Sequence, residues 1–183
     1  EPYAKRTVEG DIGMRYSIHG IAEAAGIERI AELSGLTEER ASELIDYLGE
    51  HTDVLPDGDN ELEALDYALA SLAIETAVAR HAGRIEEAYT LAGLTYVQTG
   101  KDLRDVKKLI VTGGSLIRTR RTEEIAAHAF YSKAQPESLR PVSADILIDR
   151  SYIIAAMGLL SFHYPETALK IIKKEFEIHG REE

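Results

Sequence analysis

The sequence contains no cysteine and no tryptophan, and only two methionines, among its 183 residues. Without thiols the protein has no disulfide, no thiolate metal site and no cysteine nucleophile. Basic residues are in the minority, with 21 Lys and Arg against 32 Asp and Glu and a formal net charge of −11. A long-range positive field that recruits nucleic acid or an anionic membrane is absent, and neither partner is expected.

Long hydrophobic runs are missing as well. The longest, residues 153–161, is about half of the roughly 20 residues that a membrane-spanning helix needs. The N-terminus has neither an initiator methionine nor the apolar stretch of a signal peptide. These features predict a cytoplasmic protein of which the sequence is one piece.

Apolar residues, which with tyrosine make up 44% of the chain, are enough for one domain with an inserted subdomain. In the first part they recur at helical spacing. This periodicity predicts helices over residues 14–25, 27–34, 37–49 and about 62–81. Glycines punctuate the first three helices, and Thr37 is expected to cap the third. Residues 51–60 form a polar turn region before the fourth.

The second half of the sequence mixes strand and helix patterns. Residues 85–90 and 94–98 are predicted to form a hairpin that turns at Leu91, Ala92 and Gly93. Further expected elements are strands at 109–111 and 146–148 and helices from Thr122, over 150–161 and from Pro165. The pattern predicts an α/β, mainly helical protein, in which residues 1–26 and 84–183 form the core and 27–83 a helical insertion.

The turn after the strand at 109–111 carries the most informative pattern, Thr112, Gly113, Gly114 and Ser115. Two glycines after a buried strand let a flat or anionic ligand approach the backbone without meeting a Cβ, and the following helix start offers free amides. The alternative is a plain tight turn between strand and helix. For a Gly-Gly pair taken alone, the plain turn is the favoured interpretation.

A second glycine-rich cluster contains Gly10, Asp11 and Gly13, with Glu9 before it, in a short segment expected to be extended. A carboxylate between glycines can reach a metal-bound phosphate. Asp11 can also simply be a helix N-cap. Both interpretations stay open from the residues alone.

Several other motifs favour ordinary explanations. No P-loop, no complete GxGxxG and no histidine pair at zinc-binding spacing is present. Asp57, Asp59 and Glu61 resemble a calcium loop only in part and fit a solvated turn before a helix. Arg118, Arg120 and Arg121 could bind phosphate or decorate a helix face, and the solvated face is favoured.

Four separated stretches nevertheless resemble one known family, the MutL-like methylaspartate (glutamate) mutase accessory proteins, which are unrelated to the mismatch-repair protein of the same short name. They are KRTVEGDIGMRYS (5–17), RHAGRIEEAYT (80–90), GKDLRDVKKLIVTGGSL (100–116) and SLRPVSADILIDRSYIIAAMGLLSFHYPETALKIIKK (138–174). The likeness covers nearly the whole chain. Several motifs in the same order are more specific than any one of them.

The resemblance implies a ribonuclease-H-like lobe of the actin, heat-shock-chaperone and sugar-kinase ATPases, which close on ATP and magnesium. Residues 1–26 and 84–183 would then belong to the second lobe. By resemblance, the nucleotide-binding residues would be Thr112, Gly113, Gly114 and Ser115 at adenosine, Gly10, Asp11 and Gly13 near the phosphates, and Ala156 and Gly158, with Ala155, on the closing helix. The two Asp-Gly phosphate motifs of that superfamily are not in this chain, so it should bind ATP weakly and not hydrolyse it alone.

Three functions are consistent with this resemblance. The first is a chaperone-like reactivating ATPase for a cobalamin-dependent mutase, whose subunits would be its partners. The second is a small-molecule kinase, although no residue here is identified as its catalytic aspartate. The third is a non-catalytic interaction module in which the helical insertion binds a partner and the glycine turn is inert.

Overall fold

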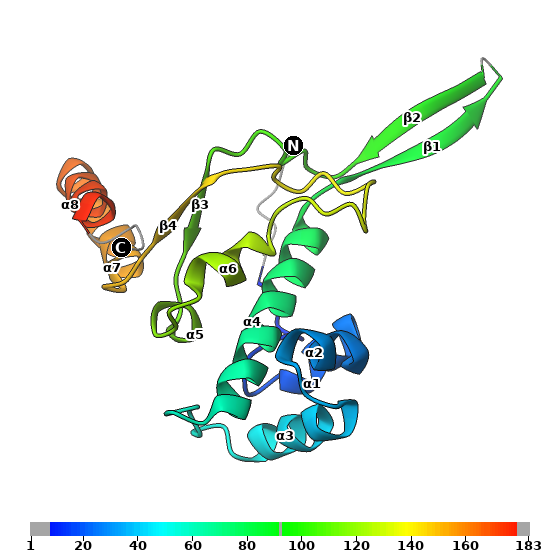
Figure 1. Cartoon of the computed structure of the whole chain (residues 1–183). Helices are drawn as coiled ribbons and strands as arrows, with labels where there is room; N and C mark the ends of the chain where they lie inside the picture. Colours follow the sequence, from blue (N-terminus) through cyan, green and yellow to red (C-terminus); the bar gives the residue numbers. More distant parts are fainter. Residues whose placement is uncertain (1–7, 92, 179–183) are drawn as a thin grey trace.

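The computed structural model describes residues 8–91 and 93–178 (Figure 1). Its helices are α1 (Ile18–Ala25), α2 (Ile27–Ser34), α3 (Glu38–Glu50), α4 (Asn60–His81), α5 (Gly114–Ile117), α6 (Thr122–Ala127), α7 (Ile153–Ser161) and α8 (Pro165–Ile178). Its strands are β1 (Arg84–Thr90), β2 (Gly93–Thr99), β3 (Lys108–Val111) and β4 (Asp145–Ile148). About half of the chain is helical, which confirms a mixed α/β class.

Helices α1 to α4 pack around one hydrophobic cluster. Ile18 and Ile21 of α1, Ile30 of α2, and Leu65 and Leu69 of α4 are all fully buried in it. These residues recur every three or four positions, so that each helix turns one apolar face to the shared core. α1 therefore packs with the helices assigned to the insertion, although the division into core and insertion stays a prediction.

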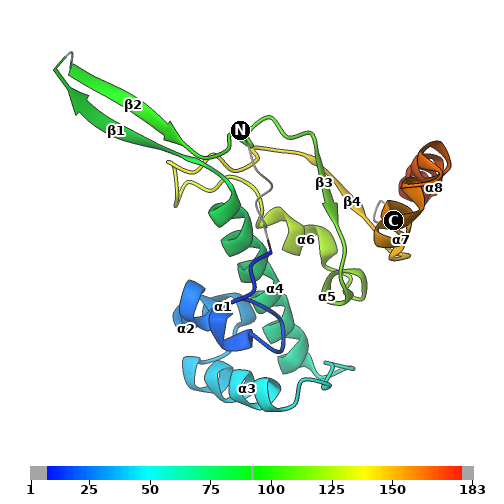
Figure 2. The same ribbon diagram turned by 180° about the vertical axis from the view of Figure 1, so that it is seen from behind.

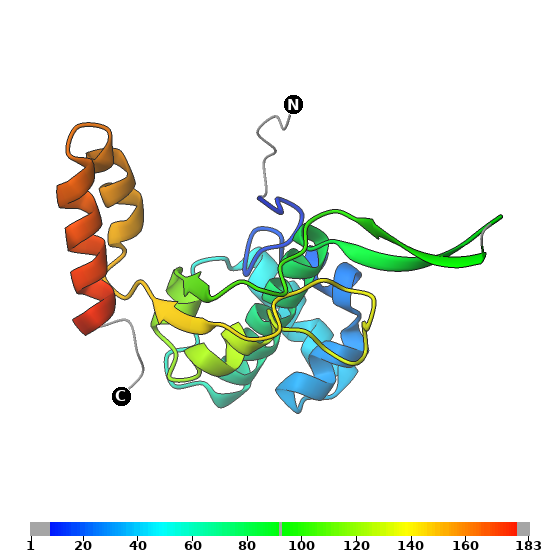
Figure 3. The same cartoon turned by 90° about the horizontal axis from the view of Figure 1, so that it is seen from above.

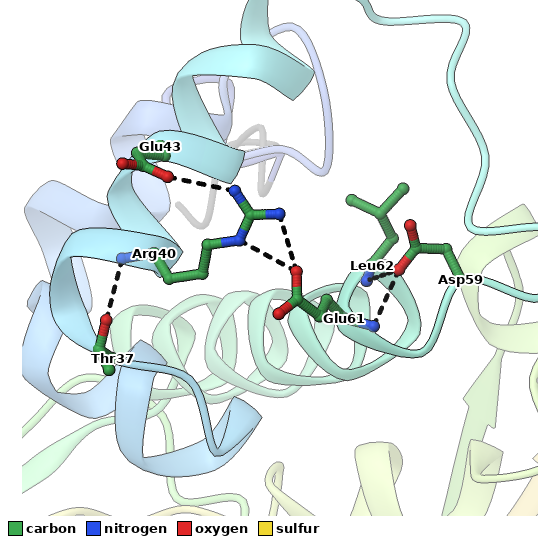
Figure 4. Close-up of polar contacts among 6 residues, drawn as sticks. All are labelled: Thr37, Arg40, Glu43, Asp59, Glu61 and Leu62. Atoms are coloured by element: carbon green, nitrogen blue, oxygen red, sulfur yellow. Dashed lines mark hydrogen bonds and ion pairs between the residues drawn. The ribbon is translucent and has the colours of Figure 1, made fainter.

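The starts of α3 and α4 are fixed by capping side chains, as Figure 4 shows. Thr37 accepts a hydrogen bond from the amide of Arg40 (3.2 Å), which confirms its expected role. Asp59 accepts from the amides of Glu61 and Leu62 at 2.9 and 3.1 Å, so it caps α4. The residues considered for a calcium loop thus form an ordinary helix start.

The first helix begins at Ile18, four residues later than the periodicity predicts. Arg15 is the physical reason for this delay, because its guanidinium binds both carboxylate oxygens of Asp66 on α4 at 2.9 Å. Its Nε also donates to the carbonyl of Val54 at 3.2 Å. These partly buried contacts tie the turn at residues 14–17 to α4 and to the loop before it.

The described part of the glycine-rich segment before α1 contains a turn at Gly10 and Asp11 instead of the expected extended piece. It crosses α1 at Gly20, where a Cβ would collide with the main-chain carbonyl of Asp11. Thr7 lies outside the described residues. Because the segment packs on α1, it belongs structurally with the helical cluster.

The described strands form two separate pairs. β1 and β2 make an antiparallel hairpin in the register Arg84↔Thr99, which confirms that prediction, although Ala92 at its turn lies outside the described residues. β3 and β4 are parallel, with Val111 opposite Ile148. Two-stranded sheets do not by themselves identify an actin-like ATPase lobe.

The β3–β4 pair joins the helical unit through α6. Val111, Ala126 and Ile148 form a second small buried cluster, against which Leu116 and Ile117 pack as expected. In both Figures 1 and 2, α6 lies between α4 and the strand pair. Seen from above, the β1–β2 hairpin and the α7–α8 hairpin project at opposite ends of the molecule (Figure 3).

One carboxylate connects α2, α4 and the residue after α6. Glu75 of α4 accepts from both terminal nitrogens of Arg29, at 3.3 and 2.8 Å, and lies 3.8 Å from Nδ1 of His128. His128 and then Arg29 hold the pKa of Glu75 at about 2, below its usual value of 4.5, although burial raises it. The carboxylate therefore stays ionised over most of the acid range.

Replacing Glu75 by glutamine is expected to lower the free energy of unfolding by about 1 to 3 kcal/mol at neutral pH, because charged hydrogen bonds are lost. The folded pKa lies below the unfolded one, so this contribution is complete above about pH 4.5 and declines as the pH falls towards 2. Urea unfolding of both proteins across this range measures the difference. Glu32→Gln, an exposed change on α2, is the control, and a pH-independent difference would contradict the prediction.

Candidate functional site

The candidate site lies where the parallel strands β3 and β4 end side by side. Val111 and Ile148 are opposite each other in the register, so the residues that follow them are brought to one edge. Thr112 begins the glycine turn after β3, and Asp149 follows β4. Ligands of parallel α/β sheets bind at this carboxyl edge because the chain leaves the strands there and opens a crevice.

The glycine turn presents main chain with little side-chain cover. Gly113 has φ 119°, a left-handed backbone that a side chain rarely adopts, and a Cβ on it would meet nothing within 4 Å. Its carbonyl accepts from the amides of Leu116 and Ile117, both at 3.0 Å, which starts the short helix α5. Gly114 and Ser115 are exposed. This geometry is the open corner that the sequence predicts.

Asp149 organises this edge from within, with only 1% of its surface exposed. Its carboxylate accepts from the amides of Ile153 and Ile154, at 3.0 and 3.2 Å, and from the hydroxyl of Thr112 at 3.3 Å. Its own amide donates to the carbonyl of Val111 at 2.9 Å. The side chain therefore ties the glycine turn to the start of α7.

The same contacts explain why α7 starts at Ile153 and not at residue 150 as predicted. Tyr152 has φ 55°. Among the described residues, every other residue with positive φ is a glycine. A left-handed residue interrupts the helix, so the helix can begin only after it, under the cap of Asp149. The phenolic oxygen of Tyr152 lies 3.3 Å from where a Cβ on Gly114 would stand, which brings the tyrosine over the turn.

Sequence reasoning missed Asp149 and Tyr152 as site residues. An acidic residue directly after a strand and four positions before an apolar helical run was a detectable signal for a cap. The left-handed backbone of Tyr152 had no such signal, because aromatic residues rarely adopt it.

The other predicted site residues lie elsewhere. Asp11 pairs with Nη1 of Arg80 at the end of α4, at 2.8 and 2.9 Å, and Glu9 binds the same nitrogen at 2.9 Å. Hydrogen bonding to Arg80 lowers the pKa of Asp11. Asp11 is not the N-cap of α1, since Ser17 holds that position and donates to the carbonyl of Gly10 at 3.2 Å.

Gly13 packs against Ser17, at the turn before α1. Ala156 and Gly158 are exposed further along α7, and a Cβ on Gly158 would meet nothing within 4 Å. Ala155 is exposed on the same helix. The structure thus brings Thr112 to Ser115 together with the start of α7, while Gly10, Asp11 and Gly13 lie on the helical unit.

Arg121 lies at the surface, as expected for the arginine cluster. Its guanidinium donates to Glu124 at 2.7 Å and lies 3.3 Å from the ring centroid of Tyr67. In the part of the chain that the structure describes, no group of three or more His, Asp or Glu side chains is placed to hold a metal ion. Within the same ranges, no helix has both the length and the apolar character to span a bilayer.

A family model for the MutL protein matches residues 1–176. The chain belongs to the MutL protein family. It is 39% identical over 174 residues to Protein MutL of Clostridium tetanomorphum, which covers 95% of this chain and 37% of that protein. The chain thus spans little more than a third of the length of this curated relative. No solved structure matches the chain.

Proposed function

We propose that this MutL chain supplies the adenosine side of an ATP site in a cytoplasmic accessory protein of a cobalamin-dependent glutamate (methylaspartate) mutase. The observation that carries the proposal is the open corner at Gly113, at the carboxyl edge of two parallel strands. Family membership and the sequence resemblance described above support the partner. The actin-like lobe is part of the same proposal.

The residues at the corner fit the sugar and base of a nucleotide. A flat ring system can lie against the main chain of Gly113, next to the phenol of Tyr152 at Gly114, and Thr112 and Ser115 are exposed hydroxyl-bearing residues beside it. The two amides at the start of α7 already donate to Asp149, so they are not free for phosphate. The corner therefore suits adenosine better than the phosphate chain.

The residues present do not fit magnesium. Asp11, the acidic residue proposed near the phosphates, is neutralised by Arg80, and a chelating cluster is lacking in the described ranges. We therefore derive no hydrolytic step from this chain. In our proposal Gly10, Asp11, Gly13, Ala156 and Gly158 line the site only when a further lobe closes on it, and that lobe supplies the magnesium ligands.

The proposed mechanism is conformational. Bound nucleotide favours one arrangement of two lobes, and an arrangement that also grips the mutase couples ATP binding to mutase binding. Asp149 is the link in this chain of contacts, since it connects the glycine turn directly to α7. Such a cycle can serve to exchange damaged cobalamin for intact cofactor.

A non-catalytic interaction module is the second candidate, favoured by uncovered apolar surface. None of the residues of α7 is buried, and Leu159 is 71% exposed. Such surface marks a contact with another protein surface and requires no nucleotide. A small-molecule kinase remains the third alternative, without a residue here that identifies it.

The decisive measurement is the affinity of the longest natural protein that contains this chain for glutamate mutase subunits, with ATP, with ADP and without nucleotide. We expect a change of about 5-fold or more between the ATP and nucleotide-free states, the usual size of such coupling. Equal affinity in all three states would refute the reactivating role. Phosphoryl transfer to a sugar or carboxylic acid would instead favour the kinase.

A further inference from the structure

A cavity of about 530 Å³ opens between α2, α4, α6 and the segment after α6. Its polar lining consists of Arg29, Glu75, His128 and Arg140. The aromatic residues Phe130 and Tyr131 also line it. None of these residues belongs to the nucleotide site proposed above. The cavity therefore calls for its own explanation.

Arg140 is the unusual member of this group. It is fully buried, with 0% of its surface exposed. Its Nη1 reaches the carbonyl of His128 only at 3.5 Å, the outer limit of a hydrogen bond. Nε and Nη2 have no hydrogen-bond partner among the residues that the structure describes. Arg140 interacts with Glu75 through its charge, but buried donors without acceptors are unfavourable, so Nε and Nη2 favour a group that accepts their hydrogen bonds.

The neighbouring charges do not fill this role. Glu75 is hydrogen-bonded to Arg29 at 2.8 Å and lies 3.8 Å from His128. Glu124 is held by Arg121 at 2.7 Å. Two arginines and two glutamates line the cavity, so their formal charges cancel. What Arg140 lacks is a hydrogen-bond acceptor at Nε and at Nη2.

We infer that this cavity binds a small organic carboxylate, whose two oxygens accept from Arg140. A guanidinium presents its donors as a planar fork that matches a carboxylate in two parallel hydrogen bonds. A carboxylate brings one negative charge beside the ionised Glu75, whereas a phosphate dianion brings two and is repelled more strongly. Phe130 and Tyr131 provide the apolar wall for a short carbon chain.

Access to the guanidinium requires movement of one side chain, because Nε and Nη2 are shielded from solvent. His128 is suited to this movement. Its ring lies 3.8 Å from Glu75 and edge-on to the ring of Tyr67, and 23% of its side chain is exposed. Its main-chain carbonyl is also the weak acceptor that a carboxylate would replace at Nη1.

The test measures thermal unfolding of the 183-residue chain in increasing propionate, at constant ionic strength set with chloride. At roughly tenfold excess over Kd the midpoint should rise by about 3 to 5 °C. Arg140→Met should abolish this shift while leaving the midpoint without propionate unchanged or higher, because it removes buried donors that have no acceptor. Arg104→Met, which removes a surface arginine paired with Asp102, should keep the full shift.

Should Arg140→Met fail to fold, the unaltered chain still decides the matter. In nitrogen-15 spectra of arginine side chains, the Nε–H signal of Arg140 should move with propionate, and it should be the slowest to exchange with water. An unmoved signal, equal midpoint shifts in chain and Arg140→Met, or a response to phosphate and none to propionate would each overturn the carboxylate site.

Discussion

Replacing Gly113 by valine in the longest natural protein that contains this chain is expected to weaken ATP binding by about 100-fold or more. Two effects combine at this position. Its φ of 119° is strained for any side chain, and the new side chain would project into the open space where we propose that adenosine lies. Calorimetric titration with ATP measures the loss.

Gly58→Val is the matched control for this experiment. Gly58 also has positive φ, 82°, and a Cβ on it would meet nothing within 4 Å, but it lies in the loop before α4. It should therefore reproduce the backbone strain and leave ATP affinity unchanged. If both variants bind ATP as the parent does, the corner is an inert turn and the interaction-module reading gains support.

Asp149→Ala is expected to lower the free energy of unfolding by about 2 to 4 kcal/mol, the sum of a lost helix cap and buried donors left unpaired. The amides of Ile153 and Ile154 and the hydroxyl of Thr112 lose their shared acceptor. Chemical denaturation of the chain measures the stability change. In the longer protein, ATP affinity should fall as well, because the turn loses its anchor.

Two further variants separate the role of Asp149 from the general effect of removing an acidic side chain. Asp149→Asn retains an acceptor oxygen of the same shape and should recover part of the stability. Asp145→Ala, at the exposed start of the same strand, should change stability by no more than about 0.5 kcal/mol. If Asp145→Ala and Asp149→Ala lowered the free energy of unfolding equally, the helix cap and the contact with the Thr112 hydroxyl would not be the cause.

Much of the secondary structure follows from local signals. The periodic apolar residues of α2 to α4, the cap at Thr37 and the proline at the start of α8 predict those elements closely, because each signal acts within one helical turn. The β1–β2 hairpin follows in the same way from its flanking β-formers. Predictions failed where a distant residue intervened, as Arg15 did by reaching Asp66 and Val54.

The sequence by itself determined the α/β class, the helical unit, the open glycine corner and membership of the MutL family, since all of these depend on neighbouring residues or on ordered motifs. Only the tertiary structure decided that Asp149 anchors that corner, that Asp11 pairs with Arg80, and that Arg140 is buried without a full set of acceptors. The physical reason is that hydrogen bonds and burial join residues far apart in the chain, and no local pattern encodes which of them meet.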